Sequence, residues 1–168
     1  TSVNDYKQFA NTFYSWTRDF SSVVYDGTHS DKRSDLITYQ SYNEFSRGIN
    51  SIPSSDANYT DNYKHIRRTN LLIENAETYS KPEDIKQYLG EAYFFRAYSY
   101  FDLLQLYGDV IITKKPLDIT DPEMKVKRND RSEVVDLIID DLNHAVENLP
   151  AFKELTTEEE GRISKEGA

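Results

Sequence analysis

Cysteine is absent from the 168-residue sequence, and proline, glycine and methionine are scarce, at five, six and one residues. Without cysteine the chain has no disulfide, no thiolate metal site and no cysteine nucleophile. So few prolines and glycines exclude a collagen-like or low-complexity chain. No apolar run approaches the roughly 18 residues that a membrane-spanning helix needs, and the first residues lack the basic and apolar regions of a signal peptide.

Basic residues are also in short supply, with 20 Lys and Arg against 29 Asp and Glu and a formal net charge of −9. A surface this acidic repels phosphate backbones, so we expect no nucleic-acid partner. Arg67 and Arg68 are therefore interpreted as members of surface ion pairs. The length fits a single domain with a hydrophobic core, and the 13 tyrosines suit half-buried positions and wet interfaces.

Motifs that carry chemistry are missing as well: there is no phosphate-binding glycine loop, nucleophile elbow or paired-histidine zinc motif. Asp141 and His144 have the spacing of half a di-iron site, but a matching second motif is absent, so we interpret them as solvated residues of a helix face. Asp26, His29 and Asp31 match no ordered ligand set and are interpreted as a plain polar loop. We expect no metal, no cofactor, no catalytic residue and no enzyme activity, with a carboxylate pair assembled by the fold left open.

Four helices are predicted by apolar residues at steps of three and four, at about residues 3–24, 60–79, 81–107 and 131–149. Gly108 and Pro150 are expected to end the last two helices, and segment 110–113 is expected to be extended. On the fourth helix the expected buried residues are Val135, Ile138, Leu142, Ala145 and Leu149.

The third helix carries a very wide apolar stripe, which predicts a central position with neighbours on most sides. Arg96 lies inside this stripe. A buried guanidinium has to be paired or to extend outwards, and the candidate partners are Glu74, Glu77 and Asp102. We interpret Arg96 as part of a structural ion pair rather than as a ligand-binding residue.

The stretch from about residue 25 to 59 has no helical period and contains several turn-forming residues. A structureless connection of this length is unusual in a compact domain and is often functional. Tyr25, Tyr39, Tyr42 and Tyr59 fall within it, off any helical stripe. Their rings can stack on a sugar, a peptide or another flat ligand. The alternative is that they fold back over the helices as a lid.

A family resemblance starts from residues 91–110, EAYFFRAYSYFDLLQLYGDV, which are similar to the signature helix of the SusD/RagB family of outer-membrane nutrient-binding lipoproteins from Bacteroidetes. Residues 63–74, 130–142 and 161–168 resemble the neighbouring family segments, in the same order and spacing. The resemblance covers roughly residues 59–168, and four collinear matches are more specific than any single motif.

The resemblance implies an all-α fold of antiparallel helix pairs, akin to tetratricopeptide repeats, with a long inserted loop at about residues 25–59. It implies that residues 1–168 form one helical domain, the N-terminal portion of a longer protein. Because helical repeats bury their faces on neighbours, we also expect an exposed apolar patch on the third or fourth helix. The family's lipid-bearing cysteine is missing, so a membrane anchor would lie outside this sequence.

By resemblance, the function is that of a polysaccharide-utilisation protein on the extracellular face of the outer membrane. It would capture an oligosaccharide or polysaccharide and deliver it to a SusC-like TonB-dependent transporter, without catalysis. The alternative is a helical-repeat scaffold that binds a peptide or protein partner. Family binding residues vary, so none is carried over by position. The site residues that we predict from the loop are Tyr39, Tyr42, Asn43 and Tyr59.

Overall fold

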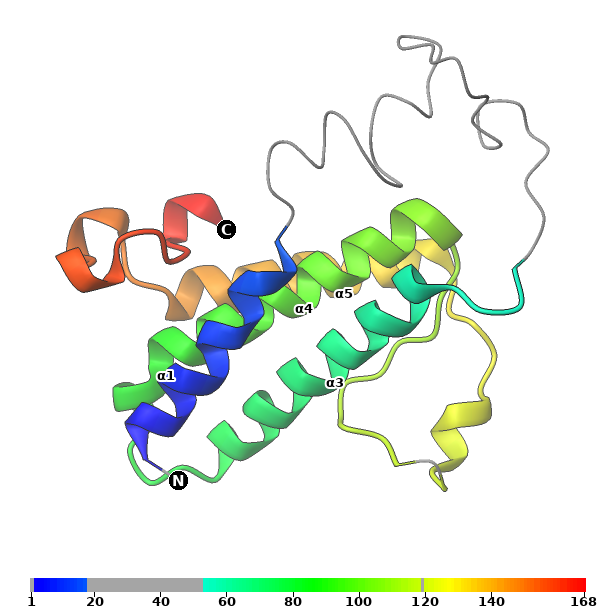
Figure 1. Ribbon diagram of the computed structural model, residues 1–168, viewed down its shortest axis with the longest axis horizontal. Coiled ribbons are helices and arrows are strands. Elements are labelled where there is room, and N and C mark those ends of the chain that lie inside the picture. Colours follow the sequence, from blue (N-terminus) through cyan, green and yellow to red (C-terminus); the bar gives the residue numbers. More distant parts are fainter. Residues whose placement is uncertain (1, 18–52, 119) are drawn as a thin grey trace, which may run out of the picture. The chain divides into compact units, whose positions relative to one another are not determined.

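The structure is a computed structural model that describes residues 2–17, 53–118 and 120–168. Its α-helices are α1 (Val3–Asn11), α3 (Ala57–Glu77), α4 (Lys86–Tyr107) and α5 (Arg131–Asn148) (Figure 1). Contacts group the chain into two units, residues 1–13 with 57–168, and residues 14–56. The first unit contains all four helices, and the following description concerns it.

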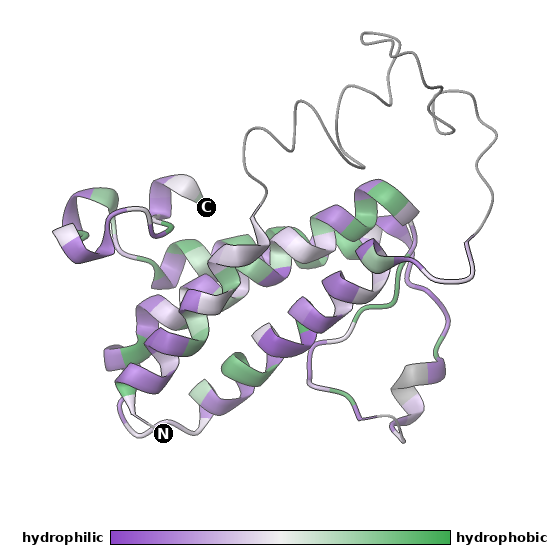
Figure 2. Ribbon diagram, in the orientation of Figure 1, coloured by the Kyte–Doolittle hydropathy of each residue, from purple (hydrophilic) through white to green (hydrophobic). Residues whose placement is uncertain are grey.

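Helix α4 is the centre of this unit, because α1, α3 and α5 all contact it (Figure 1). Phe95, Tyr100 and Leu103 of α4 are almost completely buried. Hydrophilic and hydrophobic segments alternate along α3 (Figure 2), as expected of a helix with one face packed against a neighbour. The central position predicted for the third helix is therefore confirmed.

The helix ends follow local signals. The backbone N–H of Ser2 donates to the Asp5 carboxylate at 2.7 Å, and that of Asp130 donates to Glu133 at 3.1 Å, so both helices start with a capping box. Gly108 ends α4 with a φ of 69°, in the left-handed region that glycine adopts without steric cost.

Two predicted boundaries need correction. The first helix was expected to run to about residue 24, but α1 ends at Asn11 and a 3₁₀ turn, Thr12–Trp16, follows; residues 18–24 lie outside the described residues. The third helix begins with a separate 3₁₀ turn, Pro82–Ile85, before α4. Proline at the start of a turn lacks the N–H that an α-helix interior would use, which favours such a short initial turn.

The extended segment after Gly108 forms a single antiparallel bridge, between Val110 and Asn129, rather than a strand. The Asn129 backbone N–H donates to the Val110 carbonyl at 2.9 Å, and the Ile112 N–H donates to Asn129 Oδ1 at 3.0 Å. These two hydrogen bonds join the beginning and the end of the connection between α4 and α5.

The buried face of α5 agrees with the prediction except at Val135: Ile138, Ala145 and Leu149 are buried, and Leu142 packs partly buried against the core. The buried residues of α5 are Val134, Leu137, Ile138, Asp141 and Ala145. Val135 is instead exposed, and with Ile139 and Val146 it forms an outer apolar stripe that we call the α5 stripe. The prediction is wrong for Val135, and it omitted Asp141 because an acidic residue is not expected on a buried helix face. The expected exposed apolar patch on the third or fourth helix is confirmed by this stripe.

Asp141 is buried because it pairs with Arg96 of α4. Arg96 Nε donates to Asp141 Oδ2 at 2.8 Å, and Nη2 donates to Oδ1 at 2.6 Å. Arg96 Nη1 donates to the Asn70 side-chain oxygen at 2.8 Å. The Arg96 and Asp141 side chains are only 5% and 0% exposed, so this two-pronged contact is shielded from water. One residue each from α3, α4 and α5 thus meets in a buried network.

This network confirms the ion-pair interpretation of Arg96 but corrects its details. The partner is Asp141 rather than Glu74, Glu77 or Asp102, and Asp141 is not a solvated residue. Burial acts to lower the pKa of Arg96, whereas the hydrogen bonds and charge of Asp141 raise it, and the net effect is a raised pKa. Arg96 therefore stays charged inside the protein.

We predict that Asp141→Leu lowers the free energy of unfolding by about 3–5 kcal/mol, because it leaves the Arg96 charge buried without a carboxylate. The double variant Arg96→Met/Asp141→Leu should recover much of this loss, since an apolar pair of similar volume does not need solvation. Denaturant titration measures both changes. Asp140→Leu is the matched control, because the neighbouring Asp140 side chain is 56% exposed; equal losses for Asp140→Leu and Asp141→Leu would contradict the prediction.

Candidate ligand-binding pocket

A pocket of about 440 Å³ lies between the first half of α3 and the segment that follows Gly108. The residues that α3 contributes to its lining are Tyr59, Thr60, Tyr63, Lys64 and Arg67. The residues contributed by the other side, which we call the 111–117 wall, are Ile111, Thr113, Lys115 and Leu117. This volume falls in the range of small-molecule sites.

The aromatic side of the pocket is built by α3. The rings of Tyr59 and Tyr63 have centroids 4.8 Å apart, and Tyr59 meets Tyr107 edge-on at 5.2 Å. Tyr59 and Tyr63 are four residues apart on one face of the helix, so their rings are neighbours. Both are partly buried against the core. The core therefore holds the aromatic surface of the pocket in place.

The Tyr63 hydroxyl donates a hydrogen bond to the Ile111 carbonyl at 2.8 Å, across the pocket. Burial, together with the hydrogen bond and charge of Tyr59, raises the pKa of Tyr63 well above its usual range. The hydroxyl therefore stays protonated and keeps its role as a donor. This bond fixes the near end of the 111–117 wall to α3.

The middle of the wall is fixed by two buried helix residues. Asn70 Nδ2 donates to the Thr113 carbonyl at 3.1 Å and to the Lys115 carbonyl at 3.2 Å. The Tyr100 hydroxyl donates to the Thr113 carbonyl at 3.1 Å and accepts from the Thr113 N–H at 2.8 Å. Since Asn70 is also held by Arg96, the buried network of the three helices continues into the pocket wall.

Cationic side chains stand at the rim. Arg67 Nε donates to the Leu117 carbonyl at 3.3 Å, and Arg67 Nη2 lies 3.7 Å from Asp118. Lys64 Nζ lies 2.8 Å from Asp61, one turn back on the helix. The Lys64 and Arg67 side chains are 67% and 50% exposed, so a ligand entering from solvent can reach them.

The prediction that Arg67 and Arg68 form surface ion pairs is confirmed for Arg67, which meets Asp118. Arg68 Nη2 instead donates to the Thr12 hydroxyl at 2.9 Å, and its guanidinium lies over the Phe9 ring at 5.1 Å. Arg68 therefore fastens α3 to the end of α1.

The structure places one of the predicted site residues in the pocket. Tyr59 lines it, although Tyr59 belongs to the first turn of α3 rather than to a loop. The residues around Tyr59 are polar, so the sequence shows no apolar periodicity at this turn. The ring contacts of Tyr59 with Tyr63 and Tyr107 stabilise the turn in the structure. Tyr39, Tyr42 and Asn43 lie outside the described residues and stay predictions.

The sequence pattern does not single out the other pocket residues, because Tyr63 and Arg67 fall within a predicted helix and the 111–117 wall has no periodicity. The signal that could have found them is the spacing of Tyr59, Tyr63 and Arg67, which places all three on one helix face. Asp26, His29 and Asp31 also lie outside the described residues.

The described part of the chain shows neither a metal-binding cluster nor a membrane-spanning helix. Within it, no three His, Asp or Glu side chains converge into a group that could hold a metal ion. None of the helices there is long and apolar enough to cross a membrane.

We predict that Asn70→Ala loosens the 111–117 wall, because it removes the donor shared by the Thr113 and Lys115 carbonyls. The loss should be about 1–3 kcal/mol of unfolding free energy, the cost of leaving buried polar groups unpaired, with faster amide exchange at Ile112 and Thr113. Asn75→Ala is the matched control, since the exposed Asn75 side chain bonds only within α3. Unchanged exchange in Asn70→Ala would show that the wall does not depend on Asn70.

Residues 4–166 match a SusD-like family described as "Starch-binding associating with outer membrane". A SusD-like protein of Formosa agariphila, P38, is 38% identical over 104 residues, which are 60% of this chain and 20% of that protein. A crystal structure of a SusD-like protein from Bacteroides fragilis has a TM-score of 0.77 at 27% identity, over 99% of this chain and 33% of that one.

A structure described as a laminarin-binding SusD-like protein has a TM-score of 0.62 at 28% identity, over 72% of this chain and 26% of that one. The chain thus spans a third or less of the length of these relatives. The likeness confirms the predicted all-α, SusD-like helical fold and the outer membrane as the location. From the match over nearly its whole length, the chain belongs to the SusD-like family.

Proposed function

We propose that the protein binds an oligosaccharide or polysaccharide on the extracellular face of the outer membrane, in a site to which the pocket between α3 and the 111–117 wall contributes. The observation that carries this proposal is the pairing of the Tyr59 and Tyr63 rings with a wall fixed by Asn70 and Tyr100. The family description as starch-binding and the laminarin-binding relative support a glycan as ligand.

The physical basis is the two-sided character of a sugar ring. Its C–H faces stack on aromatic rings, and its hydroxyl groups need donors and acceptors at the edges. Tyr59 and Tyr63 supply the aromatic surface, and Thr60 and Thr113 add polar groups to the lining. Each aromatic contact contributes on the order of 1 kcal/mol. A pocket whose wall is already hydrogen-bonded loses little conformational entropy when a ligand enters.

The proposed role ends at binding and delivery. The ligand would pass to a SusC-like TonB-dependent transporter, as the resemblance to the SusD/RagB family implies, and the protein would carry out no chemistry on it. Tyr39, Tyr42 and Asn43 are also proposed to contribute ring faces and an amide to saccharide binding. The amide of Asn43 offers both a donor and an acceptor to sugar hydroxyls.

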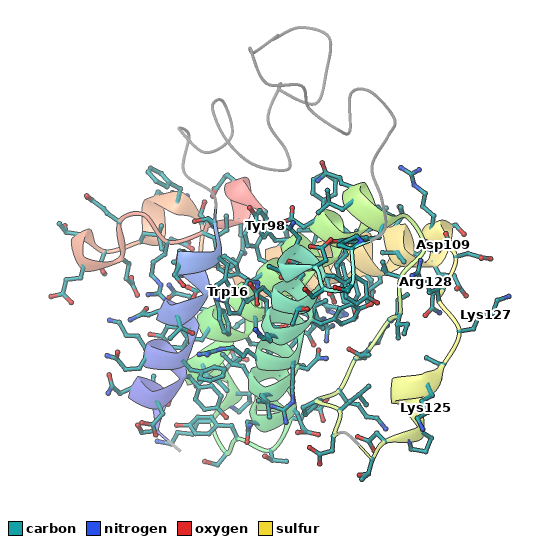
Figure 3. All side chains as sticks on the ribbon, turned by 45° about the vertical axis from the view of Figure 1, so that its right-hand side comes forward. Trp16, Tyr98, Asp109, Lys125, Lys127 and Arg128 are labelled. Atoms are coloured by element: carbon teal, nitrogen blue, oxygen red, sulfur yellow. The ribbon has the colours of Figure 1, made fainter. Side chains whose placement is uncertain are left out.

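The test begins with a glycan array and continues with calorimetric titration of the saccharide that binds best. We predict that Tyr59→Leu weakens binding about fivefold, the equivalent of roughly 1 kcal/mol, because leucine keeps apolar volume but has no ring face. Tyr98→Leu is the matched control, since Tyr98 is a tyrosine of α4 that does not line the pocket (Figure 3). Equal affinities of Tyr59→Leu and the parent would remove Tyr59 from the site.

The double variant Tyr39→Ala/Tyr42→Ala, titrated in the same way, tests the residues outside the described part of the chain. If the double variant bound the saccharide as tightly as the parent, Tyr39 and Tyr42 would not be binding residues, and we would assign them a packing role.

A second candidate is a scaffold for a peptide or protein partner, and the α5 stripe favours it. Val135, Ile139 and Val146 are 36%, 53% and 40% exposed on one face of α5. Exposed apolar residues that gather on one surface are typical of protein interfaces. The two functions separate by variant: Ile139→Ser would abolish partner binding and leave saccharide binding unchanged, whereas Tyr59→Leu would do the reverse.

A further inference from the structure

We infer that the saccharide bound at the pocket carries an anionic group, a carboxylate or a sulfate. The inference deepens the proposed function and rests on it. The observation is the charge of the lining: Lys64, Arg67 and Lys115 are cationic, and none of the described residues that line the pocket is acidic. The charged residues of this lining are positive, whereas the whole chain has a formal net charge of −9.

The cations stand on both sides of the pocket. Lys64 and Arg67 are three residues apart on the face of α3 that also carries Tyr63. Lys115 comes from the opposite wall, where Asn70 Nδ2 holds its backbone carbonyl at 3.2 Å. A sugar that stacks on the tyrosines would therefore have positive side chains at two of its edges.

Acidic neighbours lie just outside the lining. Asp61 contacts Lys64 at 2.8 Å, and Asp118 lies 3.7 Å from Arg67, too far for a hydrogen bond. The side chains of both aspartates are largely exposed, at 53% and 82%, and such surface pairs contribute little energy. An anionic group of the ligand can thus replace Asp118 at the guanidinium of Arg67 at small cost.

The chemistry of Arg67 fits a planar or tetrahedral oxyanion. A guanidinium presents several N–H groups in a rigid fork, which binds two oxygens of a carboxylate or sulfate at once. Its Nε already donates to the Leu117 carbonyl, and this orients the side chain along the wall. The acidic surface elsewhere repels anions, so selective attraction of an acidic sugar depends on these pocket cations.

The experiment compares matched saccharides on the intact protein by titration. One pair is an oligogalacturonate and its methyl ester, which differ in the carboxylate charge. The other pair is dextran sulfate and dextran of equal length, which differ in sulfate. A glycan array of acidic and neutral oligosaccharides extends the comparison to other backbones. We expect the acidic member of at least one pair, or the acidic glycans of the array, to bind at least tenfold more tightly.

Variants of the pocket cations test whether these side chains cause the preference for acidic saccharides. Arg67→Gln and Lys115→Gln should each weaken acidic binding about tenfold, the size expected for one charge-assisted hydrogen bond, and so reduce the ratio of acidic to neutral affinity. Lys127→Gln is the control of equal charge, because Lys127 extends from the same connection into solvent and does not line the pocket (Figure 3). Raising the salt concentration should weaken the acidic ligands alone.

The outcomes separate this inference from the proposed function. Equal binding of acidic and neutral saccharides, or equal losses in Lys127→Gln and Arg67→Gln, would overturn the charge assignment and leave glycan binding intact. A carboxylate preference and a sulfate preference each support the inference and identify the anion. Failure to bind any saccharide would overturn both the inference and the proposed function.

Discussion

Arg96 and Asp141 lose their hydration at the point where α3, α4 and α5 meet, and two buried charges are tolerated only when each satisfies the other. The guanidinium meets both carboxylate oxygens, and its remaining terminal nitrogen bonds to Asn70. A sliding or rotation of any one helix would break at least one of these contacts. The ion pair joins α4 to α5, and the hydrogen bond to Asn70 adds α3, so the network favours one register of the three helices.

The same network explains why the pocket has a defined shape. Asn70 accepts from Arg96 on one side and donates to the Thr113 and Lys115 carbonyls on the other. Tyr100, buried in the core of α4, holds Thr113 through both its N–H and its carbonyl. A segment without regular secondary structure is thus held at Thr113 and Lys115 by side chains of two helices. The aromatic and cationic groups of α3 face a surface that is already in place.

The sequence predicted what depends on local signals. Periodicity and Gly108 located the helices, because each signal acts within a few residues. The family resemblance supplied the order of the helix pairs. The predictions that failed concern residues whose partners are distant in sequence. Asp141 was predicted to be solvated because its partner, Arg96, lies 45 residues away in the sequence. The omission of Asp141 from the buried face of α5 followed from that error, and the pocket was missed because its wall is held by side chains that are distant in sequence, Tyr63, Asn70 and Tyr100.

The most direct test is amide NMR of the intact protein during titration with the saccharide that binds best. If the pocket is the site, the shifts on ligand addition should concentrate at residues 59–67 of α3 and at the 111–117 wall. The signals of the outer face of α5, around Ile139, should stay unchanged. Shifts confined to α5, with residues 59–67 and 111–117 unaffected by a saturating ligand, would contradict the account.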